Sequence, residues 1–329
     1  MKKYILILFL TLTVQNIAQP EFSRISSMPG AFSRFGFGAR GIGMGNAMSA
    51  ITEGNLIAYY NPALSSFQQK NSFQAGYTFL SLDRTLNFLS FTRKFDFYSA
   101  SDSVKPRSTA GLSFGVINSG VSKIDGRDNN GFKTGDLSTS ENQFFLGLAN
   151  RFSDKFALGV SVKFYYYKLY EEISSTGLGF DIGAVYKFNE YFTFSLMISD
   201  LNSKYKWDTS PVYGQQGTVK EDKFPVLKKF GISYFNPEYN LLTAIEFENS
   251  NAETNFLRFG IEYNIYDRLF IRGGLDQFNL SNKDFPIKPS LGFSYSYDLN
   301  GWIAGFDYAY MLEQNSTSDR HVVGINLVF

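Results

Sequence analysis

Few residues of this sequence have the types and spacing that chemistry at an active site requires. A serine hydrolase needs a His base beside its nucleophile, and the sequence holds a single His, His321, with Asp319 and Arg320 next to it. One His also speaks against a His-based metal site. The absence of Cys from the sequence excludes thiol chemistry and disulfides. We therefore predict no catalytic residues and no enzymatic activity.

Two other patterns look like ligand sites but lack the required context. The segment 36–41 matches the dinucleotide fingerprint GxGxxG, yet no strand precedes it and no βαβ unit surrounds it. Asp125, Asp128 and Asp136 could bind Ca²⁺ weakly, but their spacing differs from that of an EF-hand loop, so a polar loop is the better interpretation. We predict neither a cofactor nor a metal. The balance of 31 basic and 30 acidic residues gives no reason to expect a nucleic-acid partner.

The elements that would position any site are β-strands. In residues 155–168, apolar side chains such as Val160 alternate with small or polar ones such as Gly159, and the pattern returns in 176–188 and 190–199. Runs of about ten residues are long enough for a tilted strand to cross a bilayer. A soluble sandwich or lipocalin-like barrel is the alternative. The glycine-rich second face, which would solvate poorly, favours a membrane barrel.

The alternating segments predict an all-β protein, a transmembrane antiparallel β-barrel of about fourteen strands with both termini in the periplasm. We place the strands at 72–81, 86–95, 108–118, 142–151, 155–168, 176–188, 190–199, 227–236, 239–248, 255–264, 268–276, 288–298, 301–311 and 319–329. Long polar connections, expected to be external loops, are 119–141, 200–226, 277–287 and 312–318. From its place in the alternation of the last strand, we expect His321 to point toward lipid.

The chain divides into three parts. Residues 1–18 have a basic end, an apolar core and a small residue before the expected cut, as in a signal peptide. Residues 19–71 are rich in glycine and do not alternate, whereas residues 72–329 hold the strands. We expect an exported protein with an N-terminal segment followed by the barrel.

Three motifs of the N-terminal segment resemble the signature of the PorV/PorQ family, which is related to the FadL-type long-chain fatty acid channels of bacterial outer membranes. They are Gly38-Ala39-Arg40, the run from Gly43 to Ala47, and Tyr60-Asn61-Pro62-Ala63. The resemblance implies an outer-membrane location and an N-terminal segment folded into the lumen as a plug. It gives a plug-shaping role to Gly38, Arg40, Gly43, Gly45, Asn61 and Pro62.

If the alternate positions that carry large apolar side chains face lipid, the positions that face inward are unusually rich in glycine. The inward glycines are Gly76, Gly111, Gly115, Gly147, Gly159, Gly177, Gly179, Gly183, Gly231, Gly260, Gly274, Gly292, Gly305 and Gly324. Glycine weakens a strand, so its repeated use needs a reason. Either the glycines leave room for the N-terminal segment, or they relieve the curvature of a closed sheet.

The inward charges are few and are expected to pair across neighbouring strands. A connection symmetric about Glu172 would place Lys163 directly opposite Asp181. A hairpin closed by a three-residue loop at 266–268 would place Glu262 opposite Arg272 and Arg258 opposite Asp276. Such pairs mainly fix register; the alternative role is guidance of an anionic head group.

Two functions follow from the resemblance. The first is that of an accessory of type IX protein secretion, which binds secretion-machine proteins or cargo signals through the loops 119–141 and 200–226. The alternative is FadL-like passive transport of hydrophobic molecules from the external loops, past the plug and sideways through the wall. Candidate contacts for such a ligand are Phe35, Phe37, Met44, Met48, Phe145 and Phe270. In both cases outer-membrane lipid surrounds the barrel.

Overall fold

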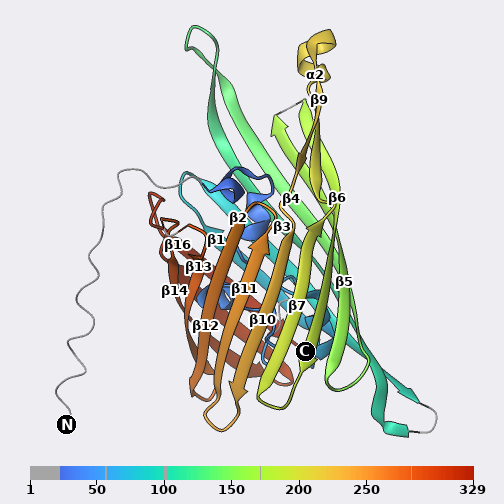
Figure 1. Cartoon of the computed structure of the whole chain (residues 1–329). Helices are drawn as coiled ribbons and strands as arrows, with labels where there is room; N and C mark the ends of the chain where they lie inside the picture. Colours follow the sequence, from blue (N-terminus) through green and yellow to red (C-terminus); the bar gives the residue numbers. More distant parts are fainter. Residues whose placement is uncertain (1–22, 56–57, 100–101, 171, 283) are drawn as a thin grey trace, which may run out of the picture.

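Fourteen antiparallel strands form a closed barrel in the computed structural model, which describes residues 23–329 except 56–57, 100–101, 171 and 283 (Figure 1). They are β1 (Ser72–Phe79), β2 (Arg84–Ser99), β3 (Asp102–Arg127), β4 (Lys133–Arg151), β5 (Phe156–Tyr170), β6 (Ile173–Lys187), β7 (Phe192–Leu201), β10 (Leu227–Asn236), β11 (Leu241–Ser250), β12 (Thr254–Tyr266), β13 (Leu269–Asn279), β14 (Lys288–Leu299), β15 (Trp302–Met311) and β16 (Arg320–Val328). β1 pairs with β16 and closes the ring. The predicted fold class is confirmed. The predicted signal peptide, 1–18, lies outside the described residues.

The two faces of the barrel wall differ as the alternation predicts. On β5, Leu158 and Val160 are 42% and 51% exposed, whereas Ala157 and Ser161 are buried. His321 is exposed on the outer face of β16, and its Nδ1 lies 2.7 Å from the hydroxyl of Tyr308. An outer surface covered with large apolar side chains has the character of a lipid-facing surface.

The prediction that 119–141 form a loop is wrong, because β3 and β4 continue as a paired hairpin beyond the barrel (Figure 1). Ile124 lies opposite Leu137, and only 128–132 form the turn. Asp128 Oδ1 accepts hydrogen bonds of 2.9 Å from two backbone N–H groups of that turn. Polar residues on both faces resemble a loop in sequence, yet backbone pairing between two strands needs no apolar face.

The predicted loop 200–226 is also largely ordered. It contains a second, two-stranded sheet of β8 (Lys204–Asp208) and β9 (Val219–Lys223), joined by α2 (Ser210–Tyr213) and η4 (Gly214–Gln216). This hairpin stands at the end of the barrel opposite the short turns (Figure 1). Tyr205 of β8 is buried against Tyr165 of the barrel wall, with ring centroids 6.4 Å apart.

The N-terminal segment, here residues 23–71, contacts opposite sides of the barrel wall. Its described residues form four short helices: η1 (Arg24–Ser27), η2 (Ala31–Arg34), α1 (Ala39–Gly43) and η3 (Pro62–Phe67). α1 contacts β13 to β16, whereas η3 contacts β2 to β6, so the segment bridges the interior between the two walls (Figure 1). Within the described ranges, no helix has the length and apolar character needed to cross a membrane.

The wall glycines are where the N-terminal segment approaches most closely. A Cβ on Gly183 would lie 2.0 Å from Asn61 Oδ1, and one on Gly274 would lie 2.1 Å from Gly45 N. Gly159 faces the segment in the same way, with 2.4 Å to Ala63 N. These contacts favour the first explanation of the inward glycines, room for another part of the chain, because a side chain there would overlap the segment's backbone or its Asn61 side chain.

Candidate functional site

Asn61 and Pro62 shape the start of η3 and fix it to the wall. Asn61 Oδ1 accepts a hydrogen bond of 3.0 Å from Ala63 N, and Pro62 occupies the first helical position, where no N–H is needed. Asn61 Nδ2 donates to Ser49 O at 3.2 Å and to Ala184 O of β6 at 3.3 Å. One side chain therefore caps the helix and joins two parts of the segment to the barrel.

The motif glycines have separate geometric roles. Gly38, before α1, and Gly45, after it, have positive φ angles of 70° and 57°, which favour glycine. A Cβ on Gly45 would lie 2.6 Å from Leu275 N, whereas one on Gly43 would approach Gly292 Cα at 3.3 Å. Gly45 is thus the more restricted position.

Arg40 connects α1 to a predicted charge pair of the wall. Its Nε and Nη2 donate to Glu262 at 2.8 and 2.7 Å, and its Nη1 donates to the carbonyls of Glu53 and Asn55 at 3.0 and 2.6 Å. Arg272, directly opposite Glu262 as expected, donates through Nε to the same carboxylate at 2.5 Å. The Glu262–Arg272 pair was predicted from the sequence, whereas nothing in the sequence indicated that Arg40 would bind the same carboxylate.

A second cluster links the segment to β12 and β13. The pairing of β12 with β13 shifts register at Arg258, yet the expected contact forms: Arg258 Nε lies 2.7 Å from Asp276 Oδ1. Asn46 Nδ2 donates to Asp276 Oδ2 at 2.7 Å, and the Tyr60 hydroxyl donates to Asn46 Oδ1 at 2.5 Å. Burial raises the pKa of Tyr60, which keeps the hydroxyl a neutral donor. Glu248, which sequence reasoning missed, also binds Arg258, at 3.0 Å.

The third pair forms in a register different from the expected one. Lys163 lies opposite Gly179 rather than Asp181, because an irregularity near Tyr170 makes the connection asymmetric. Lys163 Nζ still reaches Asp181 Oδ2 at 2.8 Å, and Asp200 at 3.1 Å. The Asp200 contact had no sequence signal, since it depends on where β7 ends beside β6.

Four of the six candidate ligand contacts pack against other side chains in the interior. Phe37, Met44, Met48 and Phe145 are at most 5% exposed and belong to one apolar cluster. They line neither of the two larger cavities described next. Phe35 and Phe270 do line a cavity, but at opposite ends of the barrel.

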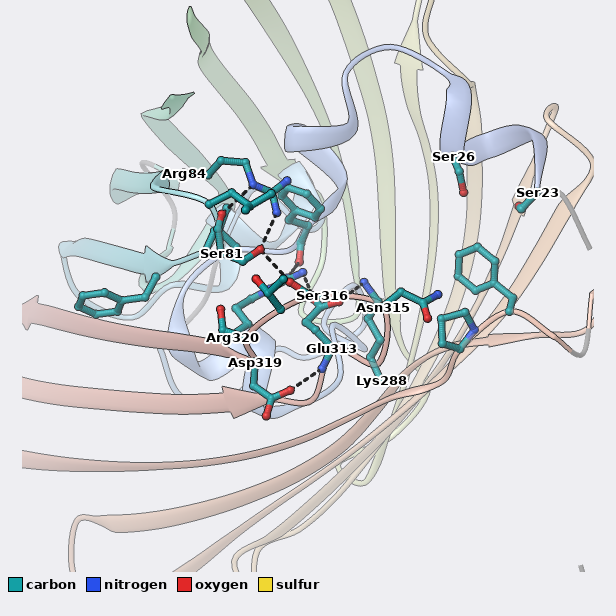
Figure 2. Close-up of a pocket in the computed structure, with 18 of the residues that line it drawn as sticks. Ser23, Ser26, Ser81, Arg84, Lys288, Glu313, Asn315, Ser316, Asp319 and Arg320 are labelled. Atoms are coloured by element: carbon teal, nitrogen blue, oxygen red, sulfur yellow. Dashed lines mark hydrogen bonds and ion pairs between the residues drawn. The ribbon is translucent and has the colours of Figure 1, made fainter. Parts of the chain in front are cut away.

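The upper cavity, of about 610 Å³, opens at the end opposite the short turns. It lies between the connections β1–β2, β13–β14 and β15–β16, as Figure 2 shows. Its apolar lining comprises Phe35, Phe79, Leu80, Leu82, Phe285 and Pro286. At its rim, Ser81 and Ser316 lie 2.8 Å apart through their hydroxyls, and Lys288 pairs with Glu313 at 2.8 Å (Figure 2). These six apolar residues share the lining with thirteen polar or charged ones, so the cavity is mixed in character and offers apolar surface beside charged groups.

The lower cavity, of about 350 Å³, lies at the short-turn end and is lined by residues that include Arg40, Arg272 and Phe270. Described residues of the N-terminal segment also line three smaller cavities, of about 210, 40 and 20 Å³.

Comparison with solved structures identifies hydrocarbon channels among the proteins of similar fold. The toluene transporter TodX of Pseudomonas putida is 15% identical, with a TM-score of 0.57 over 89% of this chain and 96% of TodX. The monoaromatic hydrocarbon channel CymD is 15% identical, with a TM-score of 0.61 over 89% and 98%. A FadL homologue of Pseudomonas aeruginosa is 14% identical, with a TM-score of 0.53 over 89% and 98%.

No family model matches this chain, and no curated protein matches it significantly. At these identities the structural similarity establishes the fold and nothing beyond it. The structures compared give no support to the PorV/PorQ resemblance as such. This chain has the closed-barrel fold of FadL-type channels.

Proposed function

We propose that this protein is a passive channel of the bacterial outer membrane for hydrophobic small molecules, with the N-terminal segment as its plug. The observation that supports this most is the upper cavity, whose lining includes six apolar residues, among them Phe35 of that segment. The fold shared with the hydrocarbon channels points the same way. Nothing in the comparisons supports the secretion-accessory interpretation.

Phe35 provides a route by which a ligand could act on the segment. Arg320 Nη1 donates to Phe35 O at 2.8 Å, and the guanidinium carbon lies 4.9 Å from the centre of the Phe35 ring. Arg320 is also paired with Glu313 of the β15–β16 connection. A hydrophobic molecule that enters the upper cavity would contact Phe35 and compete with these interactions. Displacement of the segment would then open the path toward the lower cavity.

A reversible disulfide tests whether transport needs the segment to move. Ser49 Oγ of the segment lies 2.8 Å from Ser195 Oγ of β7, and the native sequence contains no Cys. In the double variant Ser49→Cys/Ser195→Cys, oxidation should join the segment to the wall. We expect toluene flux into proteoliposomes to fall at least tenfold in the oxidised form and to recover with dithiothreitol. The single variant Ser49→Cys is the control, and undiminished flux in the oxidised double variant would refute the plug.

The rim of the upper cavity should determine how well hydrocarbons are captured. Leu82 is 72% exposed and lines this cavity. Leu82→Asp removes the apolar contact that Leu82 would make with an entering ligand, which is worth about 1 kcal/mol for a leucine that the ligand covers in part. We expect toluene uptake at low concentration to fall about fivefold, with unchanged thermal stability. Leu280→Asp, in a loop position 50% exposed and outside the cavity, should leave uptake unchanged; equal losses in both variants would contradict a role for the cavity.

A further inference from the structure

The lower cavity has a charge pattern that a path for neutral hydrocarbons does not need. Four cationic side chains line it, Arg40, Lys70, Arg268 and Arg272, against the single carboxylate of Glu262. Two further carboxylates lie close to these cations. Asp298 Oδ2 is 3.1 Å from Arg268, and Asp307 Oδ1 is 3.9 Å from Arg272. Even with both counted, four positive charges face three negative ones.

Glu262 is shared between two guanidinium groups and leaves one of them incompletely bonded. It accepts two hydrogen bonds from Arg40 and one from Arg272. Arg40 donates its remaining hydrogen bonds to backbone carbonyls. Arg272 donates through Nη2 to Ser294 Oγ at 2.7 Å, whereas its buried Nη1 makes no hydrogen bond among the described residues and has only the ion-pair contact with Asp307 Oδ1 at 3.9 Å. A buried donor without an acceptor is costly, so an oxyanion that drew this group into a hydrogen bond would be favoured.

Two of the cations that line this cavity are accessible to solvent. Lys70 is exposed and has no ion-pair partner among the described residues, and the side chain of Arg268 is 34% exposed. Phe270, Ile303 and Val328 add an apolar part to the same lining. The cavity thus offers charge to one end of a ligand and apolar surface to the other.

We propose that the lower cavity is a binding site for a small molecule that carries an oxyanion, a carboxylate or a phosphate, next to a short apolar part. The oxyanion is held by Lys70 and Arg268, with the guanidinium group of Arg272 behind them. This site is distinct from the upper cavity. It does not require hydrocarbon transport, because Lys70, Arg268 and Arg272 line the cavity with the N-terminal segment in the position that the structure shows.

Isothermal titration calorimetry of the purified protein in a non-ionic detergent tests the site with three probes: hexanoate, inorganic phosphate and hexanol. We expect at least one of the two anions to bind at a single saturable site, and hexanol not to displace it. In Lys70→Gln/Arg268→Gln, the affinity for that anion should fall at least tenfold. Lys220→Gln removes one charge from β9, at the other end of the molecule, and should leave the affinity unchanged.

The outcomes separate the two ligand classes and can overturn the proposal. Binding of hexanoate alone identifies a carboxylate with an apolar body, and binding of phosphate alone identifies a phosphate-bearing ligand. Failure of both anions to bind, or equal affinity in the native protein and the double variant, refutes the site. Both substituted side chains are at least partly exposed, and unchanged far-ultraviolet circular dichroism checks that the variants fold.

Discussion

Replacement of Arg40 by Gln is expected to destabilise the folded barrel by about 3 kcal/mol, because it breaks a buried ion pair. The substitution removes both hydrogen bonds to Glu262 and leaves the carbonyl oxygens of Glu53 and Asn55 without their donor. Arg40 is 6% exposed, so water replaces these bonds poorly. Urea unfolding of the protein in phospholipid vesicles measures the loss.

Arg268→Gln is the matched control for this variant. Arg268 pairs with Asp298 at 3.1 Å, and their side chains are 34% and 51% exposed. An exposed pair contributes at most about 1 kcal/mol. If the two variants lost equal stability, Arg40 would not anchor the N-terminal segment to the wall. Planar-bilayer conductance provides a second measurement, since a loosened segment in Arg40→Gln should increase the current.

Gly45→Val is expected to cost about 3 kcal/mol or more, from strain and overlap together. Gly45 has a φ of 57°, which disfavours a β-branched residue. The added Cβ would lie 2.6 Å from Leu275 N and 2.7 Å from Phe259 O. Both atoms belong to the backbone of the wall and cannot move aside without disturbing the β12–β13 pairing. The same vesicle unfolding experiment measures the effect.

Gly131→Val separates strain from overlap. Gly131, in the turn of the β3–β4 hairpin, has a φ of 84°, but a Cβ there would meet nothing within 4 Å. Only the backbone strain applies, about 1–2 kcal/mol. Gly43→Val, with its nearest contact at 3.3 Å, should lie between the two. A Gly45→Val variant no less stable than Gly131→Val would show that the segment does not press against β13.

The sequence by itself determined the number of barrel strands and the face of the barrel wall to which their side chains point. These features depend on local alternation, which each strand carries independently of its partners: Val160 faces outward and Ser161 inward whatever lies beside β5. The Glu262–Arg272 pair could also be predicted from the sequence, because a short turn sets the register of a hairpin. The lengths of β3 and β4 could not be predicted, since their outer parts are held by pairing with each other.

Only the tertiary structure decided which parts of the chain meet inside the barrel. Arg40 and Glu262 are separated by 222 residues, and nothing in the neighbourhood of either residue specifies the other. The same holds for Asp200 beside Lys163, which follows from an asymmetric connection between β5 and β6 and from the place where β7 ends. The two cavities are likewise spaces left between distant segments. Their position depends on how the N-terminal segment fits against the wall, and packing of this kind leaves no periodic trace in a sequence.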